Sequence, residues 1–184
     1  MLRILLSLIS LIFLYSCDSS KIKATFTPDE TGWLVYELGD TVHFASNTGD
    51  SAIITVDFRT DMSQTGMHYP IEAESSLKFS ATGDTLKIYL LKDKSVFRKY
   101  FRINRVYRSL DLIQLADSVT IGSKKFNEVY IISEDTTGND VKIKRVYFKK
   151  KDGILRCDMR DNRSYEMVTP EPRLNSIRIT EKKQ

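Results

Sequence analysis

Apolar and polar residues alternate along most of the chain, in short runs separated by turn-forming residues. Alternation places every second side chain on one face of an extended strand, so these runs predict half-buried β-strands. The pattern therefore predicts a mainly β fold: one antiparallel domain, built as a meander, a curved sheet, a half-barrel or a sandwich. The expected strands are 33–38, 41–46, 52–58, 77–79, 86–90, 96–107, 126–133, 141–148, 154–160 and 164–168.

Turn signals fall between these runs. Glycine adopts the positive φ that tight hairpin turns require, so a Gly-Asp pair between two alternating runs predicts a hairpin. Residues 60–74 are expected to form a long loop, and only residues 110–116 have a spacing compatible with a short helix. The hairpin signals are Gly39-Asp40, Gly49-Asp50, Gly83-Asp84, Asp152-Gly153, Asp161-Asn162 and the run 136–140.

Alternation also predicts which side chains point into the core. Ala52, Ile54, Val56 and Phe58 should share the inner face of one strand, and Leu86, Ile88 and Leu90 that of another. Near the end of the chain, Leu155, Cys157 and Met159 should share a face, which makes Cys157 a small buried apolar residue.

The first sixteen residues break this pattern. One basic residue, Arg3, precedes the eleven residues 4–14 (ILLSLISLIFL), of which only two serines are polar. A span of the hydrocarbon core needs about 20 residues, so this run is too short to cross a membrane. Its length and its basic start are typical of a secretory signal peptide.

Four residues at the end of this leader, Leu14-Tyr15-Ser16-Cys17, resemble the lipobox of bacterial lipoproteins, although Tyr15 is bulkier than its usual occupant. The resemblance implies that the Cys17 thiol receives a diacylglyceryl group, that the leader is cut before Cys17, and that the new amine is acylated. It implies a lipid-anchored protein of the bacterial cell envelope that faces the periplasm, on either the inner or the outer membrane. The alternative is an ordinary secretory leader, with Cys17 free or paired with Cys157.

The expected organisation follows from these observations. Residues 1–16 are the signal peptide, residues 17–30 the lipidated cysteine and a tether, residues 31–168 the β domain, and residues 169–184 a tail. The tail begins with Pro170-Glu171-Pro172, which interrupts regular structure, and 176–179 would suit a last edge strand.

Charge is distributed unevenly along the chain. Residues 18–86 hold 4 basic and 11 acidic side chains, whereas residues 87–184 hold 23 basic and 13 acidic ones. Acidic early strands could pair with basic later strands, and lysines could guard a sheet edge. The alternative is a basic surface that meets an anionic lipid, a glycolipid or an acidic envelope protein.

The run 98–108 interleaves aromatic and basic residues, and Arg98, Arg102 and Arg105 are its candidate contacts to an anionic partner. Such a run also suits single-stranded nucleic acid, which an exported protein rarely meets, so no nucleic-acid partner is expected. The structural alternative is a strand whose aromatic rings pack inward while its cationic tips reach water.

The search for catalytic chemistry finds no nucleophile motif, no phosphate-binding loop and no cofactor motif. His43 and His68 lack neighbours at metal-ligand spacing, and alternation places His43 toward solvent. Glu72 and Glu74 would share a strand face, with Asp57 and Asp61 near them in sequence, and paired carboxylates can hydrolyse glycosides.

The sequence therefore favours a non-catalytic envelope binding or structural module, held at the membrane through lipid on Cys17. A carrier of an apolar ligand in a curved sheet or half-barrel is the first alternative. A glycan hydrolase that uses paired carboxylates is the second.

Overall fold

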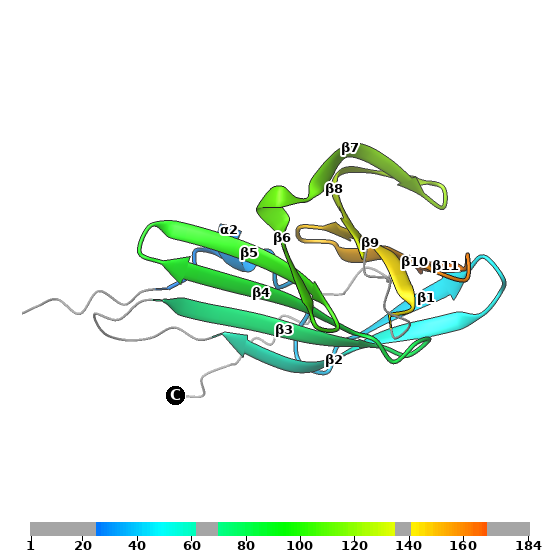
Figure 1. Ribbon diagram of the computed structural model, residues 1–184, viewed down its shortest axis with the longest axis horizontal. Helices are drawn as coiled ribbons and strands as arrows, with labels where there is room; N and C mark the ends of the chain where they lie inside the picture. The colour runs from blue at the N-terminus through cyan, green and yellow to red at the C-terminus, as the bar shows by residue number, and fades with distance from the viewer. Residues whose placement is uncertain (1–24, 62–69, 135–140, 169–184) are drawn as a thin grey trace, which may run out of the picture.

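The computed structural model describes residues 25–61, 70–134 and 141–168. Eleven antiparallel strands form one sheet that curls into a half-barrel, which confirms the expected mainly β fold class (Figure 1). Apart from the sheet, the described residues form only the short helix α2 (Pro28–Thr31) and the 3-10 turn η1 (Leu110–Leu112). The strands are β1 (Thr41–Ser46), β2 (Ser51–Asp61), β3 (Ile71–Phe79), β4 (Thr85–Asp93), β5 (Val96–Ile103), β6 (Val106–Ser109), β7 (Gln114–Ile121), β8 (Lys124–Ser133), β9 (Ile143–Lys149), β10 (Gly153–Met159) and β11 (Ser164–Met167).

Two meanders make up the sheet, in the order β6-β5-β4-β3-β2-β1-β11-β10-β9-β8-β7. The first and last strands pair in the middle of the sheet, where Phe44 of β1 lies opposite Met167 of β11. The two edges, β6 and β7, are consecutive in the chain and joined through η1, but no ladder connects them. The order is that of a ring of strands opened at one place, between β6 and β7.

Large apolar side chains fill the concave face and join strands that are far apart in the sheet. Phe101 of β5 and Phe148 of β9 lie with ring centroids 5.8 Å apart, and Phe79 of β3 and Tyr165 of β11 lie 5.4 Å apart. The curl therefore brings the two halves of the sheet face to face around one core. The predicted inward positions Ala52, Ile54, Val56, Leu86, Ile88 and Leu90 are all buried there.

The segment before β1 is not the strand that its alternation predicts. Residues 33–38 join no ladder, and instead Trp33, Leu34 and Tyr36 are buried in the concave core. The Trp33 ring packs against Tyr130 of β8, at 5.2 Å, and against Phe148 of β9, at 6.1 Å. A segment surrounded by side chains needs apolar residues at some of the same positions as a strand, which is why the pattern misled.

Two β-bulges reverse the expected side-chain parity. An irregularity between Val56 and Phe58 leaves Phe58 47% exposed, so its predicted inward position is wrong. A second one between Ile154 and Arg156 puts Leu155 in a different cluster from Cys157 and Met159, although Cys157 is buried as predicted. A bulge adds one residue to a strand and moves the following side chains to the other face.

Strands β7 and β8 form an arm that arches over the outer face of β9, β10 and β11 (Figure 1). Only Tyr130–Ser133 of β8 pairs with β9, and Glu128 has a positive φ of 56° where the arm leaves the sheet. The arm covers a second apolar cluster of Ile121, Phe126, Val129, Tyr147 and Leu155.

Other boundaries also differ from the expected ones. The helix-compatible run 110–116 is helical only over Leu110–Leu112 and then becomes β7, which the sequence analysis missed. The expected strand 96–107 is divided into β5 and β6 by a turn at Asn104. Both ends of the expected long loop 60–74 belong to strands, because β2 extends to Asp61 and β3 begins at Ile71.

The predicted turns lie where glycine marks them. Gly83 has a φ of 77° in the β3–β4 turn, and Gly153 has a φ of 87° after the β9–β10 turn. Gly153 has a second constraint, because the Tyr36 hydroxyl accepts a 2.6 Å hydrogen bond from the Ile154 amide beside it. The run 136–140 and the tail 169–184 lie outside the described residues.

We predict that Gly153→Ala destabilises the protein by about 1–3 kcal/mol more than Gly83→Ala, because a β-carbon at Gly153 would overlap Tyr36. Both glycines have positive φ, so both substitutions carry the same backbone penalty, and Gly83 has open space around it. Chemical denaturation of the two variants measures the difference. Equal losses would show that Tyr36 is not seated against this turn.

Candidate functional site

The predicted lipidation site, Cys17, lies outside the described residues, which begin at Thr25. There the Lys92 ammonium of β4 donates a 3.1 Å hydrogen bond to the Thr25 carbonyl. Phe26 packs against Phe97 of β5, with ring centroids 6.2 Å apart. The structure thus places residues 25–30, which the sequence analysis assigned to the tether, against the sheet. No helix among the described residues has the length and apolar character to cross a bilayer.

Helix α2 is fixed at this position by a capping box and two ion pairs. The Thr27 hydroxyl accepts from the Glu30 amide, and the Glu30 carboxylate accepts from the Thr27 amide at 2.7 Å. Lys92 pairs with Glu30 at 2.8 Å, and Lys150 of the β9–β10 turn pairs with Asp29 at 2.7 Å. Burial alone would raise the pKa of Glu30, but the hydrogen bonds from Lys92 and Thr27 outweigh it and lower this pKa. The helix therefore connects the two halves of the sheet.

Two cations cover Trp33, which follows this helix. Lys99 Nζ of β5 lies 5.2 Å from the ring centroid and Lys150 Nζ lies 5.5 Å from it. The Lys151 amide also donates to the Gly32 carbonyl at 3.0 Å. Cation–π contacts and backbone hydrogen bonds thus join the incoming chain to β5 on one side and to the β9–β10 turn on the other.

The three arginines predicted to contact an anionic partner are spread along β5. Arg98 and Arg102 both point to the outer face, because Phe97, Phe101 and Ile103 point inward. Arg105 is exposed in the turn after β5, at the other end of the strand from Arg98. Five residue steps of β5, at about 3.3 Å each, already separate Arg98 from Ile103 at the start of that turn, so one small ligand cannot bind both.

The outer face of β4, β5 and β6 presents what we call the tyrosine–arginine face: Tyr89, Arg98, Tyr100, Arg102 and Tyr107. The ring of Tyr89 lies 6.0 Å from Tyr100 and 6.3 Å from Tyr107. Arg102 Nη1 donates to the Tyr107 hydroxyl at 3.0 Å, and its guanidinium lies 5.1 Å from the same ring. Tyr107 is 48% exposed. The contact with Tyr107 thus fixes the position of the Arg102 side chain, whereas the Arg98 side chain is exposed.

The candidate carboxylates lie next to this face but are engaged by neighbours. Glu72 and Glu74 share the outer face of β3, as predicted. Lys87 pairs with Glu74. Burial, a hydrogen bond to Glu72 and the nearby negative charge raise the pKa of the Tyr89 hydroxyl. Asp57 is exposed beside the bulge of β2, and Asp61 ends that strand.

The other candidate ligands do not assemble into a site in the part of the chain that is described. His43 is exposed on β1, as predicted, and His68 lies outside the described residues. No group of three or more His, Cys, Asp or Glu side chains converges within residues 25–61, 70–134 and 141–168. Burial raises the pKa of the Cys157 thiol, which keeps it protonated and unreactive in the folded protein.

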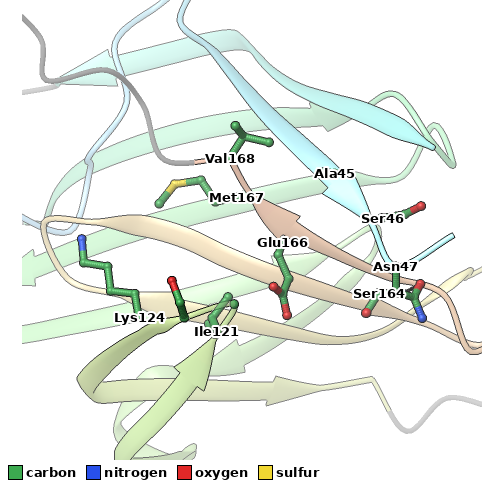
Figure 2. A pocket seen from close by; sticks show the side chains of 11 residues that line it. Ala45, Ser46, Asn47, Ile121, Lys124, Ser164, Glu166, Met167 and Val168 are labelled. Atoms are coloured by element: carbon green, nitrogen blue, oxygen red, sulfur yellow. Dashed lines mark hydrogen bonds between the residues drawn. The ribbon is translucent and has the colours of Figure 1, made fainter. Parts of the chain in front are cut away.

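Sequence reasoning missed a groove beneath the tip of the arm (Figure 2). It has a volume of about 470 Å³ and lies between residues 121–124, residues 45–47 and the end of β11. Lys124 and Glu166 are its charged residues, and the Glu166 carboxylate already pairs with Arg156 at 3.3 Å. The groove is mixed in polarity. No sequence signal marked it, because it depends on the arm folding back over β11.

We predict that Glu30→Gln lowers the free energy of unfolding at pH 7 by up to about 1 kcal/mol, because it breaks the ion pair with Lys92. The folded state lowers the pKa of Glu30, so the stabilisation is present above the ordinary value of 4.5 and is lost as the pH falls below it.

Denaturation of the wild type and Glu30→Gln from pH 7 to pH 3 tests this prediction, and the difference in stability should close below about pH 4.5. Asp29→Asn serves as the comparison: the folded state lowers the pKa of Asp29 too, but its ion pair with Lys150 is at the surface, so its loss of stability should have the same sign and pH dependence and be smaller. A difference in stability between the wild type and Glu30→Gln that grows as the pH falls would contradict the lowered pKa of Glu30.

Comparison with protein-family models, with curated proteins and with solved structures gives no match to this chain. Its function must therefore be argued from its own residues and their arrangement.

Proposed function

We propose that this protein is a lipid-anchored, non-catalytic binding module of the bacterial cell envelope, held through acyl chains on Cys17. One observation carries the proposal. Only eight residue steps separate the lipobox-like cysteine from Thr25, where the chain is already bound to the sheet. Two or three acyl chains on one residue give stable attachment, whereas a single chain gives marginal attachment.

The tyrosine–arginine face is the surface that we assign to an anionic envelope partner. Its arginines favour a phosphate- or carboxylate-bearing group, and the exposed ring of Tyr107 adds apolar contact. Tyr107 holds the Arg102 side chain in place, so Arg102 loses less conformational entropy when it binds a partner. Arg98 contributes from the same face of β5.

Two observations favour binding over the alternatives. Trp33, Leu34 and Tyr36 occupy the concave face on which an apolar ligand of a carrier would bind. Glu74 is paired with Lys87, so its carboxylate is already engaged and is not available as one of the two catalytic carboxyl groups of a glycosidase.

We expect the wild-type protein, expressed in a bacterium with labelled palmitate, to carry the label and to lack residues 1–16. Cys17→Ala should be unlabelled and retain its leader, because the acyl acceptor is missing. Cys157→Ala is the matched control and should be labelled like the wild type, since Cys157 is buried. Mass spectrometry of the N-terminal peptide reads both outcomes, and an unlabelled wild type would refute the anchor.

A fluorescent fatty acid separates the module from a carrier. We expect no saturable binding by the purified wild type, because the side chains of the N-terminal segment fill the concave site. Saturable micromolar binding that Trp33→Ala strengthens would instead establish a carrier in which this segment competes with the ligand.

A further inference from the structure

We infer that the end of the half-barrel where the chain enters the sheet docks on anionic phospholipid headgroups through Lys94, Lys151 and the exposed Val96 between Lys94 and Arg98. The inference rests on the proposed acylation of Cys17 and adds to it the surface that meets the membrane. The chain from Cys17 to Thr25 spans at most about 28 Å when fully extended, at up to about 3.6 Å per residue. The anchor therefore keeps this end close to the bilayer.

Three elements surround the entry point. The Thr25 carbonyl is bound by Lys92 at the end of β4, next to the β4–β5 turn that carries Lys94. The Gly32 carbonyl is bound by the Lys151 amide in the β9–β10 turn. Both turns thus lie at the same end as the tether. The opposite end carries the β1–β2 turn, because β2 runs through eleven residues from Ser51 at that turn to Asp61 at the tether end.

The charges at this end are only partly paired. Four of its acidic side chains, Asp29, Glu30, Asp111 and Asp152, are paired with Lys150, Lys92, Lys99 and Lys149. Lys94, Arg98 and Lys151 are exposed and form no ion pair among the described residues, while the other acids at this end are Asp93, Glu72 and Asp61. The tether adds Lys21 and Lys23 against Asp18. Lys94 and Lys151 are therefore unpaired, exposed cations on the two turns that lie beside the tether.

The β4–β5 turn also has a composition suited to the membrane interface. Val96 is 48% exposed, with Lys94 before it and Arg98 after it, while Phe97 points back onto Phe26. An apolar side chain flanked by cations suits the boundary between headgroups and acyl chains. Each cation near an anionic surface favours docking by about fivefold, so Lys94 and Lys151 together favour it by about 25-fold.

Site-directed fluorescence tests this orientation on the full, acylated protein. A fluorophore is placed at Ser95→Cys, in the β4–β5 turn, or at Thr48→Cys, in the β1–β2 turn, with buried Cys157 left in place. Each protein is reconstituted into vesicles of phosphatidylcholine with 30% phosphatidylglycerol or of phosphatidylcholine alone, both containing a headgroup spin-labelled quencher.

We expect at least twofold stronger quenching at position 95 than at position 48 in the anionic vesicles, and a loss of this difference in neutral vesicles or in 0.5 M salt. Lys94→Gln with Lys151→Gln should also remove it. Lys144→Gln with Arg145→Gln, two exposed cations near the start of β9, is the matched control and should retain it.

The outcomes separate the two proposals. A purified protein without acyl chains overturns both the anchor and the docking surface. Equal quenching of the acylated protein at positions 95 and 48 overturns the docking surface alone. The same conclusion follows if the quenching does not depend on lipid charge or on the Lys94 and Lys151 substitutions.

Discussion

The packing of Trp33 between the two halves of the sheet is the contact on which the rest of the structure depends. The ladder stops at β6 and β7, so backbone hydrogen bonds do not close the curled sheet. Trp33 contacts Tyr130 and Phe148 from one half and Lys99 from the other. A buried tryptophan is worth about 3–5 kcal/mol by truncation, a large part of the stability of a domain this size. Side chains thus complete the closure that hydrogen bonds leave open.

The same segment connects the fold to the proposed location. The Tyr36 hydroxyl accepts a hydrogen bond from the Ile154 amide, and α2 forms ion pairs with both halves of the sheet. The chain is therefore fixed within a few residues of the point where it reaches the sheet. A flexible linker would let the domain turn freely above a membrane. A chain that is bound from Thr25 onward instead gives the domain a defined end toward the proposed anchor.

Much of this fold could be predicted from the sequence, because alternation reports a sheet with one buried face. The strands around Ile54 and Ile88 and the turn at Gly83 needed only local information. The burial of residues 33–36 could not be predicted this way, because an extended segment enclosed by side chains and a half-buried strand have similar patterns. The positions of Phe58 and Leu155 depend on bulges, which no local propensity marks.

The candidate site could be predicted less well than the fold. The basic run singled out Arg98 and Arg102, which the fold places on one face of β5, but the turn at Asn104 that carries Arg105 away is set by tertiary contacts, including the hydrogen bond from Asn104 to buried Asp84. The groove under the arm depends on how β8 leaves the sheet at Glu128. Cationic side chains are visible in a sequence, but which of them are neutralised by partners becomes visible only in the fold.

Native-state hydrogen exchange tests the central claim most directly, since it measures the free energy of opening at individual amides. If the N-terminal segment closes the sheet, the amides of Leu34, Lys151 and Ile154 exchange with the same opening free energy as that of core residue Ile88. Exchange of these three at much lower opening free energy, while Ile88 stays protected, would show that the sheet holds its shape without the segment and would contradict the account.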